Sequence, residues 1–111
     1  MLQNARKKND VVTVKLVSGE EVIGYFESEN ANAITIRKPL VPVPASETSM
    51  VLAPFIMSGE QSVGGNLTVE LNKQTVVTVL KTNEQFTKEY QRLVSGLDFN
   101  TQAPPPGLIT T

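Results

Sequence analysis

The sequence predicts a small, mostly β domain with one C-terminal helix. Its 111 residues suit a single domain. Valine and threonine supply 14 and 11 of those residues, which is a bias toward pleated, half-buried strands. Short runs of alternating apolar and polar residues fill most of the chain, whereas apolar residues recur at helical spacing in one segment near its end.

The first two strands are predicted to form a hairpin. Residues 11–17 and 22–29 each alternate between two faces. The connection at 18–21 contains Gly19, which can adopt the positive φ that a tight turn requires. Gly24 lies inside the second strand and predicts a backbone bend or a close approach by another strand, as at the corner of a small barrel.

A turn at Asn30-Ala31-Asn32 leads into a third predicted strand over residues 33–43. Prolines at 39, 42 and 44 remove ladder donors. From about Pro39 onward, this segment must therefore leave the sheet or lie at its edge. Residues 50–57 predict a short apolar edge strand that is interrupted at Pro54.

Two more strands are expected after a glycine-containing loop. Residues 67–71 alternate in polarity, and Asn72-Lys73-Gln74 can turn the chain into a Thr/Val/Leu run at 75–80.

Residues 82–96 predict an amphipathic helix that covers one open end of the sheet. Thr82 with Gln85 fits a capping box, and Gly96 suits the position after the last helical turn. The apolar stripe consists of Phe86, Tyr90, Leu93, Val94 and Leu97.

Composition excludes most enzyme chemistry. The chain has no Cys and no His, so thiolate nucleophiles, imidazole bases, disulfides and Cys/His zinc sites are absent. The close carboxylates, Glu20-Glu21 and the Glu27/Glu29 pair, are predicted to lie by exposed turns without basic or metal-binding companions. We expect no enzyme, cofactor, metal or small-molecule substrate. Ten basic residues against 11 acidic ones also argue against a DNA-coating role.

The chain ends are predicted to lie outside the domain at residues 11–97. No window approaches the roughly 18 to 20 apolar residues of a membrane span, and no signal peptide is evident, so we expect a cytoplasmic protein without a membrane partner. Residues 1–10 read as a flexible basic arm, either solvated or contacting phosphate. Residues 98–111 read as a poorly ordered Pro-rich tail; alternatively, Leu108-Ile109 docks on a neighbouring subunit.

Residues 14–26 space their apolar positions around Gly19 and Gly24. This pattern resembles the first signature of the Sm-like family, of the LSm and Hfq type, and residues 30–36 look like the third strand of that family. The chain, with its 53–55 edge segment and trailing helix, is similar to small Sm-like proteins carried by cyanophages and related marine phages. The resemblance implies a location in the host-cell cytoplasm.

The resemblance also implies a strongly bent five-stranded barrel in a homo-oligomeric ring of roughly five to seven subunits. In such rings the fourth strand of one subunit pairs with the fifth of the next. Two apolar edges, at 51–57 and 76–80, would otherwise carry unpaired backbone groups. The predicted interface residues are Val51, Leu52, Phe55, Ile56, Val76, Val77 and Val79.

In this family, uridine-rich or adenine-rich single-stranded RNA is held by an Asp or Asn turn before strand three, a stacking side chain, and an Arg- or Lys-containing loop before strand five. Residues 80–83 mimic that loop's signature but precede a helix, so helix capping is the alternative. Residues 37–38 could contact phosphate or be a solvated strand end. The candidate RNA-binding residues are Asn30, Asn32, Arg37, Lys38, Lys81 and Asn83.

Two functions follow as hypotheses. The first is an Sm-like ring that binds single-stranded RNA weakly or selectively in RNA regulation. The second is a structural or protein-interaction ring with the same fold and no RNA site. The 30–32 turn contains no aromatic or His residue, and base stacking is worth about 1–3 kcal/mol per base. That absence counts against RNA binding, but the family resemblance keeps the RNA-binding ring as the first expectation and the protein-interaction ring as the alternative.

Overall fold

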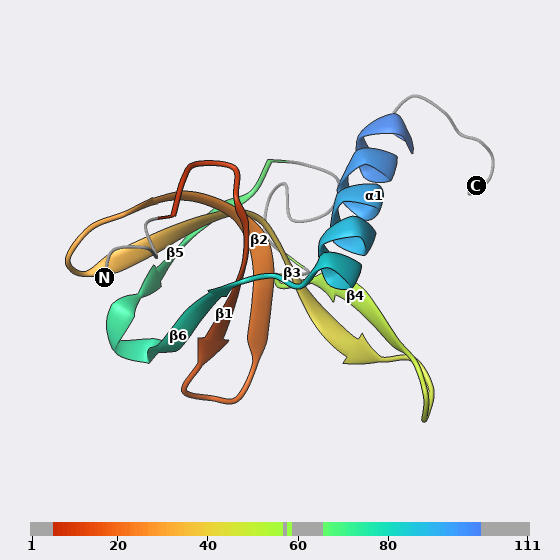
Figure 1. The fold of residues 1–111 in the computed structure, drawn as a ribbon, viewed down its shortest axis with the longest axis horizontal. Coiled ribbons are helices and arrows are strands. Elements are labelled where there is room, and N and C mark those ends of the chain that lie inside the picture. Colours follow the sequence, from red (N-terminus) through yellow and green to blue (C-terminus); the bar gives the residue numbers. More distant parts are fainter. Residues whose placement is uncertain (1–5, 57, 59–65, 101–111) are drawn as a thin grey trace.

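Six strands and one α-helix make up the part of the chain that the computed structural model describes, which is residues 6–56, 58 and 66–100, with side chains as far as residue 95 (Figure 1). The elements are β1 (Val11–Leu16), β2 (Glu21–Glu29), β3 (Ala33–Pro44), β4 (Met50–Pro54), β5 (Thr68–Asn72), the short 3₁₀-helix η2 (Lys73–Thr75), β6 (Val76–Lys81) and α1 (Glu84–Asn100).

The strands form one antiparallel sheet in the order β4-β3-β2-β1-β6, and β5 also pairs with β3. Residues 33–37 of β3 pair with β5, and residues 40–44 pair with β4. The predicted mostly β fold with a C-terminal helix is confirmed at this level. The described chain has six strands, as the residue pattern predicts and one more than the five-stranded barrel that the resemblance implies, because β4 and β5 occupy separate halves of the long β3.

The second half of β3 projects from the body as a two-stranded ribbon with β4 (Figure 1). Its last pair with β2 is Leu40 opposite Ile23, and from Val41 to Pro44 it pairs with β4 alone. A strand with one partner can accommodate proline, because a missing donor on its open side breaks no ladder bond. Of the two predicted outcomes for this segment, the edge position is the one observed.

An inner core lies inside the curled sheet. Its fully buried members come from β1, β2, β3 and β5, so strands distant in sequence share one apolar interior. Half-buried side chains of β6 pack against the same cluster. The buried members are Val12, Val14, Leu16, Val22, Phe26, Ile34, Ile36 and Leu71.

A second, outer core joins α1 to the opposite face of β1, β2 and β3. Tyr90 and Val94 of the helix pack against Val11, Ile23 and Leu40. The helix therefore covers an outer sheet face, and the prediction that it covers an open end is wrong. Val11 and Ile23 alternate with inner-core residues along their strands, so this face was free to take a helix.

Tyr90 fixes the helix to the sheet. Its side chain is 0% exposed, and its hydroxyl donates to the carbonyl oxygens of Lys38 at 2.8 Å and Arg37 at 3.2 Å. Burial raises the pKa of this hydroxyl above its usual range, so the group stays protonated as a donor. The ring also meets the ring of Tyr25 edge to face, with centroids 5.2 Å apart.

Two β-bulges decide which side chains face the inner core. Ile23 pairs with Leu40 but Tyr25 pairs with Arg37, so β3 carries one extra residue near Lys38, whose φ is +55°. A second register shift follows Phe26, where β2 carries the extra residue. Beyond each bulge, the alternation of inward-facing and outward-facing side chains along the bulged strand is shifted by one residue.

Gly24 lies opposite the first bulge. A Cβ atom at this position would lie 2.4 Å from Cγ2 of Ile36 and 3.0 Å from the carbonyl oxygen of Arg37. This confirms the close approach predicted for Gly24, since only glycine lets β3 come so near. Gly19 in the β1–β2 turn has a φ of +100°, as its position in the hairpin predicts.

The helix boundaries differ from the predicted ones. The backbone amide of Phe86 donates to Oδ1 of Asn83 at 2.8 Å, so Asn83 is the N-cap, and the hydroxyl of Thr82 instead lies 2.8 Å from that of Thr13. The helix continues through Gly96 to Asn100. Residues 98–100 of the predicted tail are thus helical, and the remainder, including the proposed docking segment Leu108-Ile109, lies outside the described residues.

Residues 6–10, the described part of the predicted arm, lie along β2. The amide of Asn9 donates to the carbonyl of Phe26 at 2.8 Å, and the amide of Phe26 donates to the carbonyl of Asp10 at 2.7 Å. These backbone bonds hold Arg6 and Lys8 beside the end of β2. Within the described residues, no helix is long and apolar enough to cross a membrane.

Candidate nucleic-acid interface

Two turns meet at one end of the sheet. The β2–β3 turn is built on Asn30, whose Oδ1 accepts from the amides of Asn32 at 2.8 Å and Ala33 at 2.9 Å. The turn between β5 and β6 is η2, and its Lys73 amide donates to the carbonyl of Asn32 at 2.8 Å. This backbone bond makes the two turns a single polar surface.

The side chains of this paired-turn surface (Asn30–Asn32 and Asn72–Gln74) differ in how free they are. Asn72, like Asn30, uses its Oδ1 within its own turn, accepting from the amide of Gln74 at 2.8 Å. Asn32 and Gln74 are exposed. None of the residues in these two turns is aromatic. The surface can therefore offer amides and a lysine to a ligand, but no platform for stacking a base.

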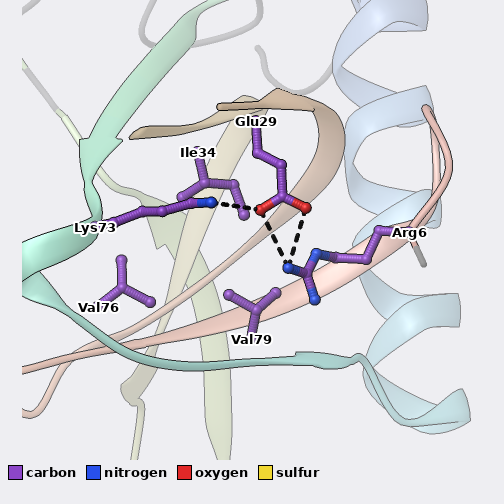
Figure 2. A pocket seen from close by; sticks show the side chains of 6 residues that line it. All are labelled: Arg6, Glu29, Ile34, Lys73, Val76 and Val79. Carbon is purple, nitrogen blue, oxygen red and sulfur yellow. Dashed lines mark hydrogen bonds and ion pairs between the residues drawn. The ribbon is translucent and has the colours of Figure 1, made fainter. Parts of the chain in front are cut away.

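Beside the paired turns, Glu29 holds an arginine and a lysine. Nη2 of Arg6 donates to both carboxylate oxygens, at 3.1 and 3.2 Å, and Nζ of Lys73 lies 3.0 Å from Oε1 (Figure 2). Partial burial opposes ionisation of Glu29, but the hydrogen bonds from Lys73 and Arg6 outweigh it and hold the pKa of this carboxyl below its usual value. Glu29 is thus a fixed acceptor.

This cluster borders a pocket of about 220 Å³. Figure 2 shows the three charged side chains on one side of it and the valines of β6 on the other. The lining is half charged and half aliphatic: Arg6, Glu29, Ile34, Lys73, Val76 and Val79. Such a lining can hold a small ligand that has one polar edge and an apolar body.

Of the predicted phosphate contacts, Arg37 lies on the outer face with Glu27 and Tyr25, away from the paired turns. Arg37 donates to Glu27 at 2.6 Å and to Oδ1 of Asn9 at 2.7 Å, and its guanidinium lies 4.8 Å from the ring centroid of Tyr25. Lys38 is the bulged residue, and its amide donates to the carbonyl of Leu67 at 2.7 Å. Intramolecular contacts therefore occupy the guanidinium of Arg37, and the backbone of Lys38 forms the bulge.

Glu27 has basic companions as well. Lys8 lies 3.2 Å from Glu27, and hydrogen bonds from Arg37 and then Lys8 hold the pKa of this carboxyl below its usual value. The prediction that Glu27 and Glu29 lack basic neighbours is wrong, because the bases come from the arm, β3 and η2, which are distant in sequence. Among the described residues, no cluster of three or more acidic side chains could hold a metal ion.

Lys81 and Asn83 lie at a third place. Lys81 is exposed at the end of β6, opposite Val12, and Asn83 caps α1. Residues 80–83 include the last two residues of β6 and the two that lead into α1, whereas the lysine-containing turn that precedes β6 is Asn72–Thr75. Sequence reasoning missed Lys73, although a lysine in a polar turn between two Val/Thr-rich strands was the signal that could have identified it.

The predicted interface residues fall into two groups. Val51 on β4 and Val77 on β6 are 47% and 62% exposed, on strands that each pair with one partner among the described residues. The others are half-buried, and several of them pack within the chain: Phe55, Val76 and Val79 against the inner core, and Leu52 against the outer core. Exposed apolar side chains that the prediction did not include are Val17, Met50 and Leu80.

Comparisons with known proteins do not assign this chain to a family. A scan against models of protein families finds no match, and a search of curated proteins finds none. Its function has to be inferred from its own contacts.

Proposed function

We propose that this chain assembles edge to edge into an Sm-like ring and binds single-stranded RNA weakly at the paired-turn surface. The observation that carries the proposal is the contact between Lys73 and Asn32, which places a lysine-bearing turn against an asparagine turn at one end of the sheet. The Sm-like resemblance implies this pairing of turns. An RNA-regulatory role in a phage-infected cell is part of the same proposal.

The curled sheet supports an Sm-like arrangement. Side chains of β1, β2, β3, β5 and β6 surround the inner core, which fits a bent five-stranded barrel to which β4 is an addition. Gly24 and the adjacent bulge supply the strong bend that such a small barrel needs. Of these features, the shared inner core and the bulge support the barrel independently of the signature that contains Gly19 and Gly24.

Edge pairing supports assembly. β4 and β6 stand at opposite ends of the strand order, and each carries an exposed valine. Open apolar edges promote uncontrolled association unless a partner covers them, and a closed ring pairs every edge. Val77→Pro would remove a donor from β6 and should convert the ring to monomers in native mass spectrometry. Val77→Thr, which keeps the donor, is the control.

RNA binding at the paired turns should be weak at each subunit. Side-chain amides can donate to and accept from base edges, and Lys73 adds one cation. Without a stacking platform, useful affinity would come from repetition around the ring. Few phosphate contacts also predict a shallow salt dependence.

Titration of labelled oligo(U) and oligo(A) by fluorescence anisotropy, with native mass spectrometry of the same samples, tests this proposal. Asn32→Ala/Lys73→Ala should weaken binding at least about fivefold while the ring mass is unchanged. Lys88→Ala on α1 is the matched control and should bind as the natural chain does. Asn30 is left intact because its side chain forms the turn. Full-strength binding by the double variant would place the RNA site elsewhere.

A protein-interaction ring is the second candidate, and a specific observation favours it. Of the predicted RNA-binding residues, Asn30 builds a turn, Arg37 is occupied by Glu27 and Asn9, and Asn83 caps the helix. A ring that binds neither oligonucleotide at low salt would select this candidate over RNA binding.

A further inference from the structure

Among the described residues, β4 pairs with β3 alone, so one side of the β3–β4 ribbon is open (Figure 1). At the base of the ribbon, the amide of Phe55 donates to the carbonyl of Pro39 at 3.2 Å. At its tip, the amide of Ala45 donates to the carbonyl of Ser49 at 3.0 Å. In an antiparallel ladder, positions that point at the partner strand alternate with positions that point away from it. Both bonds belong to one such series, whose members between them are Val41–Ala53 and Val43–Val51.

The alternation turns the backbone groups of Met50, Leu52 and Pro54 toward the open side of β4. Proline has no N–H, so this open edge presents two amide donors and three carbonyl oxygens. Met50 and its neighbour Val51 are 52% and 47% exposed, and successive side chains lie on opposite faces of a strand. A strand added along β4 would therefore gain hydrogen bonds and apolar contacts on both faces.

The other side of the ribbon is blocked by proline. Pairing with β2 ends at Leu40. Beyond it, Pro42 and Pro44 alternate with the bonded positions of β3, so their backbone groups point away from β4. Neither residue has an N–H, so that side offers carbonyl oxygens without donors. An additional strand can pair with the ribbon only along β4.

The helix brings the chain that follows it close to this open edge. Leu52 of β4 packs against the outer core that contains Tyr90. The helix runs about 15 Å beyond Tyr90 before it ends at Asn100. Packed elements lie about 10 Å apart and an added strand about 5 Å further, so the open edge lies roughly 20 Å from Asn100. Residues 101–107 extend to about 23 Å, which is enough to bring residues 108–111 beside β4.

The composition of these residues suits that position. Residues 104–106 are prolines, which favour an extended spacer, and Gly107 permits a change of direction after it. Residues 108–111, here called the tail segment, read Leu-Ile-Thr-Thr. Isoleucine and threonine favour strands, and every residue of the tail segment has an N–H to donate. The paired residues of the ribbon carry no charge, so an uncharged segment meets no unpaired charge there.

We propose that the tail segment adds as a strand to the open edge of β4 in its own molecule and blocks that edge. This inference rests on the proposed function, in which β4 of one subunit pairs with the next subunit, and it names a regulator of that pairing. A tethered segment acts at a local concentration in the millimolar range. A neighbouring subunit therefore displaces the tail segment only when the protein is concentrated.

Hydrogen exchange of single amides, read by fragmentation mass spectrometry, tests the docking in the full chain. The protein is diluted until native mass spectrometry detects only monomer. The amides of Met50 and Leu52 should then exchange at least about fivefold more slowly in the natural chain than in Ile109→Pro/Thr110→Pro. Two adjacent prolines remove a donor from whichever side of the tail segment faces β4. The amide of Val51 points at β3 and should exchange alike in both forms.

Gln102→Pro/Ala103→Pro is the matched control, because it adds the same two prolines and leaves residues 108–111 intact. It should protect Met50 and Leu52 as the natural chain does. Equal exchange of these two amides in all three forms would overturn the proposal. Loss of protection in the control would overturn it as well, because the effect would not depend on the tail segment.

Native mass spectrometry over a dilution series tests the regulation. Ile109→Pro/Thr110→Pro should form rings at a protein concentration at least about threefold lower than the natural chain requires. Assembly at the same concentration in both forms, or rings of the natural chain that never dissociate on dilution, would show that the tail segment does not compete for the edge and would overturn the inference.

The outcomes separate this inference from the proposed function. If the tail segment protects Met50 and Leu52 but no form assembles at any concentration, the docking stands and the proposed ring fails. If rings form and Ile109→Pro/Thr110→Pro changes neither exchange nor assembly, the ring stands and this inference is overturned.

Discussion

Glu27 and Glu29 stand two positions apart on β2, and each carboxylate contacts one arginine and one lysine, yet the two clusters differ in what they leave open. Arg37 in the first cluster is fully engaged, with contacts to Asn9 and to the Tyr25 ring. Arg6 in the second borders a pocket, and its buried Nε has no hydrogen-bond partner among the described residues. The outer cluster consists of Glu27, Arg37 and Lys8, and the inner cluster consists of Glu29, Arg6 and Lys73.

The bulge after Phe26 produces this difference. In a regular strand, residues two apart share a face. Here Phe26 pairs with Ile36 and Glu29 pairs with Ile34, so both face inward, while Glu27 lies with Arg37 on the outer face. One extra residue therefore sends two like carboxylates to opposite sides of the sheet. The outer cluster is closed and supports the fold, whereas the inner one is open to a ligand.

The largest effect should come from Tyr90, which packs against Tyr25, the ring that Arg37 of the outer cluster contacts. Tyr90→Ala removes a fully buried ring that packs against Tyr25, and should lower the free energy of unfolding by about 3–5 kcal/mol. Tyr90→Phe removes only the hydroxyl and its hydrogen bonds to two carbonyls, which should cost about 1 kcal/mol. Urea unfolding of both variants measures the two values. Equal losses would mean that the ring contributes little and that the helix is not held as described.

An intermediate effect should separate the two arginines. Arg37→Met removes the ion pair with Glu27, the hydrogen bond to Asn9 and the contact with an aromatic ring. It should lower the free energy of unfolding by about 2 kcal/mol. Arg6→Met removes an ion pair at a solvent-accessible rim, and should cost about 0.5 kcal/mol. Thermal melting of the matched pair measures the difference. If Arg6→Met is the more damaging change, the inner cluster is structural and the contrast between the two clusters fails.

The smallest effect is a dependence on acid that both clusters share. The pKa values of Glu27 and Glu29 lie below the ordinary value of 4.5, so their stabilising contribution is complete above pH 4.5 and is lost as the pH falls through the lowered values. Glu89, held by Arg92 on α1, acts in the same direction. Carboxyl NMR titration should show each group titrating below 4.5. The Glu27→Gln/Glu29→Gln double variant should flatten the fall in stability as the pH drops below 4.5.

Several features of the fold follow from local sequence. The alternation in residues 11–17 and 22–29, with Gly19 between them, is enough to predict a hairpin, because strand periodicity and turn geometry are both local. Gly24 predicted a close approach for the same reason. The helix was also predictable from its apolar spacing, although the capping residue is Asn83 and not its neighbour Thr82. Both residues can cap a helix, so only the hydrogen bonds distinguish them.

The candidate site was only partly predictable. The turn at Asn30–Asn32 was identified from sequence, but its partner was placed at residues 80–83 and not at Lys73. The order of strands in the sheet determines which turn lies beside which, and that order depends on contacts between distant residues. Arg6 was assigned to a flexible arm, because backbone pairing between residues 9–10 and Phe26 leaves no signal in the sequence of the arm.

By itself, the sequence determined where the strands and the helix lie, because hydrophobic period, glycine and proline act within a few residues. Only the tertiary structure decided which face each carboxylate occupies. A bulge forms where two strands must come into register around a shared core, and its position depends on both strands together. Glu27 and Glu29 look equivalent in sequence for that reason, and they differ once β2 pairs with β3.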